Sequence, residues 1–152
     1  MTPIAAIRTV PSSAVPLALA KLSQEYPALL HVTTHDAAME QLASSLPFFM
    51  SHGRVLTCGA WDVFPFDQTS PKPGIIAERL SCLTALLGER SGPIIVLTTV
   101  NALLQKFPPK SVLANNYFSA SVGDSLDREA LQRWLTEQGY RNVSKAMEAG
   151  EY

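Results

Sequence analysis

The sequence is poor in charge and in long apolar runs, and each of these absences narrows what the chain can be. Only 16% of its residues are charged, and its 12 basic residues are balanced by 13 acidic ones. This balance argues against a free-standing nucleic-acid binder, because such proteins neutralise phosphates with many lysines and arginines. No apolar run approaches the ~18–20 residues that span a bilayer, so we expect no membrane partner.

Cysteine and histidine are also scarce. Cys58 and Cys82 have no partner at the spacing of a metal or redox motif, and His31, His35 and His52 lack the i, i+4 arrangement typical of metal ligands. We therefore expect buried, reduced thiols in a cytoplasmic protein, histidines in structural roles, and no metal site. The N-terminal stretch has early prolines and no cleavage pattern, which predicts no signal peptide.

A phosphate-binding loop is missing as well. A Walker A loop needs glycines, whose backbone amides surround the phosphates, and a lysine followed by Ser or Thr. Residues 10–14 would occupy that position, but they read VPSSA, and Pro11 and Pro16 each remove an amide that a phosphate would need. The sequence contains neither G-x-G-x-x-G nor the G-x-S-x-G of a nucleophile elbow. We expect the chain not to bind ATP.

What is present is core-forming material, since 47% of the residues are apolar. Stripes with helical spacing alternate with short apolar runs, which predict helices and buried strands respectively. The predicted elements are helix 15–26, strand 28–33, helix 39–49, strand 54–58, helix 76–87, strand 93–98 and helix 100–105. This order predicts an α/β fold with a parallel, P-loop-like sheet and covering helices.

Three local features refine this prediction. The strand 93–98 is apolar on both faces, as a central parallel strand requires. Pro47 should kink or end its helix, because its ring clashes with the preceding turn. Gly88 should end the third helix in a left-handed conformation.

The pattern changes after about Leu113. Residues 117–122 alternate as a half-buried antiparallel strand would, and a helix is expected from Asp127, its N-cap, to Gln138, with Gly139 after its end. A further strand should begin at residues 141–144. We therefore predict one domain over residues 1–113, followed by the incomplete start of a small α+β domain over residues 114–152.

Residues 59–74 form a proline- and aromatic-rich segment without periodicity. The segment from Trp61 to Arg79 is either a loop whose aromatic side chains fill space between the sheet and the helices, or a ligand or partner loop at the carboxyl ends of the strands. Asp62 and Asp67 are compatible with a carboxylate pair in a small α/β enzyme, which would need a deep pocket. Hydrogen bonds that cap turns suit their neighbours better.

The same segment fits the pattern W-[DE]-x-x-P-[YF]-D-x-x-S-P-x-x-x-[IV]-x-x-R-L. The fitting residues are Trp61, Asp62, Pro65, Phe66, Asp67, Ser70, Pro71, Ile75 or Ile76, Arg79 and Leu80. In this pattern the chain resembles the N-terminal region of bacterial transcription-repair coupling factors. The likeness continues through VNALLQKFPP and LDREALQRWLTEQGYRNVSKAMEAGEY and covers roughly residues 10–152, whereas the first nine residues match nothing.

The resemblance implies a degenerate copy of the excision-repair protein UvrB that keeps its first domain and its UvrA-binding domain but has lost the ATP-binding loop. The motif residues are then structural, and a compact turn stands near residues 61–75 where UvrB has its DNA-gripping hairpin. Full-length relatives are multidomain, ATP-driven DNA translocases that displace stalled RNA polymerase and recruit UvrA. Their ATP, magnesium and double-stranded DNA sites would lie downstream, so no cofactor and no catalytic residue is expected here.

Arg141, in the matching G-Y-R motif, is the candidate UvrA contact that the resemblance implies, and otherwise it is a solvated arginine at a strand start. The rival interpretation is a fragment of a UvrB-type, ATP-dependent excision-repair helicase. A titration with a fluorescent ATP analogue separates the two interpretations, because only the rival predicts saturable, micromolar binding.

Overall fold

The computed structural model describes residues 9–64, 67–88, 92–118, 120–148 and 150–152. The chain forms two compact units, each of which combines two stretches of sequence. Unit 1 consists of Met1–Gly59 and Glu89–Leu104, and unit 2 consists of Ala60–Gly88 and Gln105–Tyr152. The division into domains at residue 113 stays a prediction.

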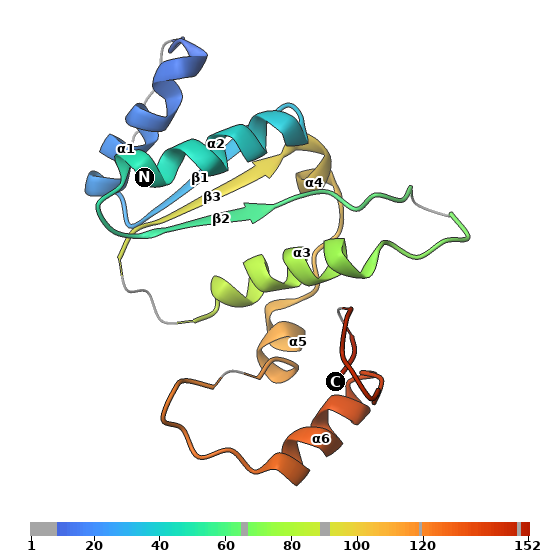
Figure 1. The fold of residues 1–152 in the computed structure, drawn as a ribbon. Coiled ribbons are helices and arrows are strands. Elements are labelled where there is room, and N and C mark those ends of the chain that lie inside the picture. The colour runs from blue at the N-terminus through green and yellow to red at the C-terminus, as the bar shows by residue number, and fades with distance from the viewer. Residues whose placement is uncertain (1–8, 65–66, 89–91, 119, 149) are drawn as a thin grey trace. The chain divides into compact units, whose positions relative to one another are not determined.

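Unit 1 is an α/β layer built on a parallel sheet with the strand order β1-β3-β2 (Figure 1). Its elements, in chain order, are η1 (Ser12–Ala14), α1 (Val15–Glu25), β1 (Ala28–Thr33), α2 (Asp36–Phe49), β2 (Arg54–Cys58), β3 (Ile94–Thr99) and α4 (Val100–Leu104). Helices α1 and α2 pack together on one face of this sheet. The predicted α/β fold with a parallel sheet and covering helices is confirmed.

The core of unit 1 lies between the sheet and these two helices. Its buried side chains are Leu19, Met39, Leu46, Ile95 and Leu97. Leu29 of β1 and Val55 of β2 both pair with Ile95, so one apolar row crosses all three strands beneath the helices. Burial of such aliphatic side chains supplies the main driving force for folding, about 1.5–3 kcal/mol for each large one.

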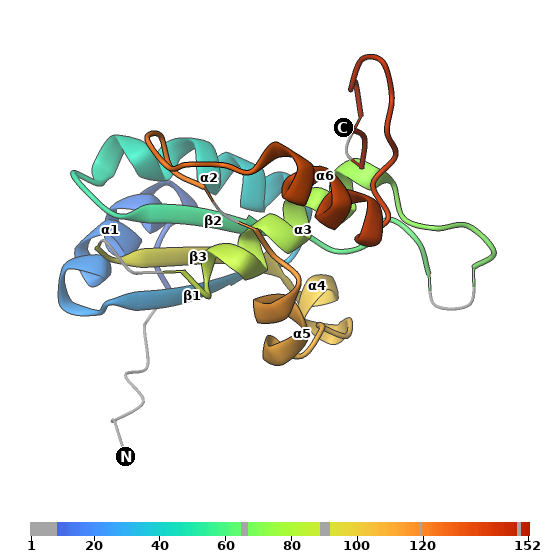
Figure 2. The same cartoon turned by 90° about the horizontal axis from the view of Figure 1, so that it is seen from below.

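Strand β3 is the central strand, as predicted, and Figure 2 shows it between β1 and β2. Five of its six residues are buried, because neighbouring strands flank it on both sides.

Pro47 lies inside α2, which continues to Phe49, so the proline does not end the helix at once. Its missing N–H falls in the last turn, and the helix ends two residues later.

Unit 2 contains the helices α3 (Pro73–Ala85), α5 (Lys110–Asn115) and α6 (Arg128–Glu137). The predicted ends of α6 are confirmed. Oδ1 of Asp127 accepts the N–H groups of Glu129 and Ala130 at 2.9 and 3.1 Å, which caps the N-terminus. At the other end Gly139 has φ +86°, and the Tyr140 N–H donates to the Leu135 carbonyl at 3.0 Å in a Schellman arrangement.

Two predictions for unit 2 are wrong. The described residues between 117 and 122 form no strand, and residue 119 lies outside the description. A turn at 121–124 follows, in which the carboxylate of Asp124 accepts the Ser121 N–H at 2.7 Å, so this N–H is not available for strand pairing. Gly88 does not adopt a positive φ, since α3 already ends at Ala85 and the Leu86 and Leu87 N–H groups close its last turn.

Candidate partner-binding site

The position of the missing phosphate loop lies in unit 1. Residues Ser12–Ala14 form a 3-10 turn in which the Ala14 N–H donates to the Pro11 carbonyl at 2.8 Å, so this amide is already used. Pro16 occupies the first turn of α1 and has no N–H to offer. The helix N-terminus therefore presents fewer amides than a phosphate-binding loop does.

An open cavity of about 500 Å³ adjoins this turn. Hydroxyl groups and apolar side chains line it together with His31, and neither a lysine nor an arginine is among the described lining residues. Burial lowers the pKa of His31 from its ordinary value of 6.5, so the imidazole is neutral at physiological pH. The described side chains that line this cavity therefore offer no cation to a phosphate, and the absence of ATP binding stays a prediction.

The motif segment that begins at Trp61 lies in unit 2 and is held by hydrogen bonds within that unit. Oδ1 of Asp62 accepts the Lys72 N–H at 3.3 Å, and its Oδ2 lies 3.6 Å from the Lys72 ammonium. Oδ2 of Asp67 accepts the Phe64 N–H at 2.8 Å. The Trp61 N–H donates to the side chain of Gln105 at 2.8 Å. Both carboxylates thus accept backbone N–H groups of their own loop.

Arg79 of α3 is the most deeply buried charged residue described, with 1% of its surface exposed. Its guanidinium carbon lies 4.9 Å from the ring centre of Trp61 and 4.4 Å from that of Phe107. Cation–π contacts of this kind join the motif segment, α3 and the chain after residue 105. Ser70 is exposed and Pro71 is half-buried beside the start of α3. Pro65 and Phe66 lie outside the described residues.

The histidines and cysteines do not gather into a site. Within the described ranges, no group of three His, Cys, Asp or Glu side chains is placed to hold a metal ion. The ring of His35 meets the hydroxyl of Thr34 at 3.3 Å, and both Cys58 and Cys82 are buried. No helix of the described part of the chain is long and apolar enough to cross a membrane.

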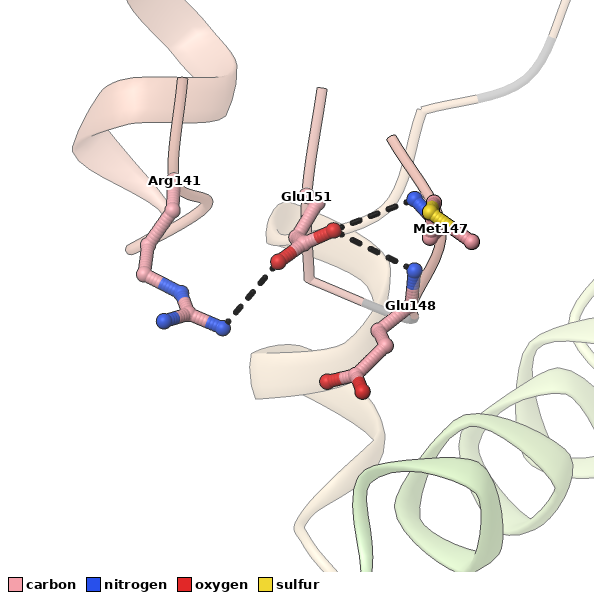
Figure 3. A network of polar contacts seen from close by, with 4 residues as sticks. All are labelled: Arg141, Met147, Glu148 and Glu151. Carbon is pink, nitrogen blue, oxygen red and sulfur yellow. Dashed lines mark hydrogen bonds and ion pairs between the residues drawn. The ribbon is translucent and has the colours of Figure 1, made fainter. Parts of the chain in front are cut away.

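Arg141 lies at the end of unit 2 in a polar network with Glu151 (Figure 3). Its Nη2 donates to Oε1 of Glu151 at 3.3 Å, while Oε2 of the same carboxylate accepts the N–H groups of Met147 and Glu148 at 3.1 and 3.3 Å. The two backbones also meet in an isolated parallel bridge, where the strand start expected at 141–144 is reduced to one pair. The arginine side chain is 71% exposed and the glutamate 14%.

The sequence predicted Arg141 as a candidate contact but did not predict that it pairs with Glu151. The two residues are ten positions apart in a segment without periodicity, and a local pattern does not reveal such a pairing. The sequence Gly150-Glu151-Tyr152 places an acidic residue at 151 but does not indicate what that residue contacts.

Curated relatives match most of this chain. It is 32% identical to the transcription-repair-coupling factor of Myxococcus xanthus over 130 residues, which are 82% of this chain and 11% of that protein. The proteins of the same name from Rickettsia prowazekii and Staphylococcus aureus strain USA300 are each 25% identical, over 86% and 93% of the chain. The chain belongs to the transcription-repair-coupling factor family. It spans about 11–12% of the length of these relatives, and no protein-family model matches it.

In this member of the family, the Glu151 carboxylate should make the network sensitive to acid. The hydrogen bond from the Met147 N–H contributes most to lowering the pKa of Glu151 from its ordinary value of 4.5. The Glu148 N–H and Arg141 lower it further, against the opposing effect of burial. A carboxylate with a lowered pKa stabilises the folded form above its ordinary pKa, and that contribution is lost as the pH falls through the lowered value.

We therefore expect the amide signals of Met147 and Glu148 in 1H–15N NMR spectra to be constant from pH 7 to 5. They should then shift together with a midpoint below 4.5, because protonation of Glu151 weakens both hydrogen bonds. The Glu151→Gln variant should lack this transition. A midpoint at or above 4.5 in the unsubstituted protein would contradict the hydrogen-bonding pattern.

Proposed function

We propose that this chain is a non-catalytic interaction module through which a transcription-repair coupling factor recruits UvrA. The observation that carries the proposal is the match, across 82–93% of the chain, to proteins named for coupling transcription to repair. The module works by presenting a surface rather than by turning over a substrate.

The chemical activity of the whole protein belongs elsewhere in this proposal. The chain corresponds to about a tenth of its relatives, so an ATP-driven motor that translocates on double-stranded DNA and displaces stalled RNA polymerase has ample room outside it. ATP and magnesium would act in that motor. The cavity beside η1 supports this division, because its described lining offers a neutral imidazole and hydroxyl groups instead of a lysine.

Arg141 is the proposed point of contact with UvrA. Its side chain is largely exposed, yet its position is restrained by the carboxylate of Glu151. Arginine is enriched among residues that dominate binding energy, since its planar group donates several hydrogen bonds to a partner. An exposed but restrained arginine loses little conformational entropy when it binds.

Arg141→Ala should weaken UvrA binding by about 10- to 100-fold, the effect of losing one central arginine at an interface. The measurement is surface plasmon resonance on immobilised UvrA, with the protein at its natural length and with the 152-residue chain. Arg128→Ala removes an equal charge from another exposed arginine of unit 2 and should bind like the unsubstituted protein. Unchanged retention of the Arg141→Ala variant would refute the assignment of this residue.

A further inference from the structure

The chain from Arg141 to Tyr152 returns on itself, and Glu151 lies where its two ends meet. The Arg141 N–H donates to the Gly150 carbonyl at 2.8 Å, and the Tyr152 N–H donates to the Arg141 carbonyl at 2.9 Å. The Tyr152 hydroxyl also meets the Thr136 hydroxyl of α6 at 2.6 Å. Backbone and side-chain bonds thus fix both ends of this segment.

The Glu151 carboxylate ties the middle of the segment to the same point. One of its oxygens accepts hydrogen bonds from two successive backbone N–H groups, those of Met147 and Glu148. The other oxygen accepts a hydrogen bond from the Arg141 guanidinium (Figure 3). Hydrogen bonds to a charged group are about twice as strong as neutral ones. The carboxylate is well shielded whereas the guanidinium is mostly exposed, so the glutamate acts as the anchor and the arginine as the group that is presented.

We propose that Glu151 is a positioning residue for partner binding: it holds the Arg141 guanidinium in one orientation at the surface, ready for a carboxylate of the partner. This inference rests on the proposed function, in which the partner is UvrA. A guanidinium has five N–H donors in a rigid fork, and the bond to Glu151 uses one nitrogen. The remaining donors suit the planar oxygen pair of an acidic side chain.

If Glu151 positions Arg141, the effect of Glu151 on partner binding depends on the presence of Arg141. Glu151 does not need to touch the partner, and its effect passes through Arg141. Replacing Glu151 by Gln removes the negative charge at nearly constant size. The substitution weakens the hydrogen bond to the guanidinium and the two hydrogen bonds from the backbone N–H groups of Met147 and Glu148. Glu148→Gln is the matched control, because it removes an equal charge from the same segment and its carboxylate points away from the network in Figure 3.

The test combines hydrogen exchange with UvrA binding in the protein at its natural length. In Glu151→Gln the amides of Met147 and Glu148 should exchange about 10-fold faster, and UvrA affinity should fall about 3- to 10-fold. Glu148→Gln should change neither quantity. In the Arg141→Ala background, Glu151→Gln should cause no further loss of affinity, a coupling that a general loss of stability would not produce.

Four results would overturn this role. Exchange rates in Glu151→Gln equal to those of the unsubstituted protein would show that the carboxylate does not hold the segment. Unchanged UvrA affinity of Glu151→Gln, with Arg141→Ala impaired, would refute the positioning role and leave the proposed function standing. Additive losses in the double variant would mean that Glu151 acts independently of Arg141. If the unsubstituted protein fails to bind UvrA, the proposed function falls, and this role falls with it.

Discussion

Arg79→Ala should lower the free energy of unfolding of unit 2 by about 3–5 kcal/mol, the cost of deleting a large buried side chain together with desolvated cation–π contacts. Arg79 is almost fully buried, and its guanidinium contacts the rings of both Trp61 and Phe107. These rings belong to segments that are far apart in sequence, so removing Arg79 leaves a cavity where three parts of unit 2 meet.

The measurement is urea unfolding followed by tryptophan fluorescence, which reports on unit 2 because both tryptophans of the chain, Trp61 and Trp134, belong to it. Arg79→Lys should be intermediate, since an ammonium keeps the charge but not the planar group that stacks on rings. The exposed Arg128→Ala should unfold like the unsubstituted protein. A loss below about 1 kcal/mol in Arg79→Ala, the range typical of surface substitutions, would contradict the role of this side chain.

Gly53→Ala should destabilise unit 1 by about 3–5 kcal/mol, because it combines backbone strain with a steric clash. Gly53 has φ +103°, and a Cβ atom there would lie 2.5 Å from the carbonyl oxygen of Pro93. That oxygen accepts the Arg54 N–H at 2.9 Å at the start of the pairing between β2 and β3. The clash is with backbone, so a side-chain rotation cannot relieve it.

Gly92→Ala separates the two contributions. Gly92 also has a positive φ, +120°, but a Cβ atom there would meet its nearest neighbours at an ordinary 3.5–3.8 Å. Gly92→Ala should therefore lower the free energy of unfolding of unit 1 through backbone strain alone, by about 1–3 kcal/mol. Hydrogen exchange of the β3 amides measures both variants within unit 1. An equal loss of stability in the two variants would show that the close approach of a Cβ atom at residue 53 to Pro93 does not destabilise unit 1.

The elements of unit 1 were predictable because their signals are local. The helical stripe that begins at Val15 and the doubly buried run of β3 each fit one period over enough residues to decide the element type. The short helix α5 was missed, since six residues after two prolines show no period. The strand expected at 117–122 failed because Asp124 holds its end in a turn, and alternation over so few residues does not reveal such competition.

The candidate site was predictable only in part, because local sequence patterns do not reveal contacts between distant residues. The resemblance led to Arg141 and to the motif residues, but their contacts join positions that are distant in sequence. Arg79 meets Phe107 across 28 residues, and Arg141 meets Glu151 across a loop. Such pairings depend on how segments return to one another, which periodicity, spacing and turn chemistry do not encode.

The most direct test of the account is a competition between this protein and UvrB for UvrA. If the chain presents a UvrB-like docking surface, adding it to a preformed UvrA–UvrB complex should release UvrB in a saturable manner. Size-exclusion chromatography measures the UvrB that is released. The Arg141→Ala variant should need at least about 10-fold more protein for the same release. Retention of UvrB on UvrA at protein concentrations that saturate binding to UvrA alone would contradict the proposal.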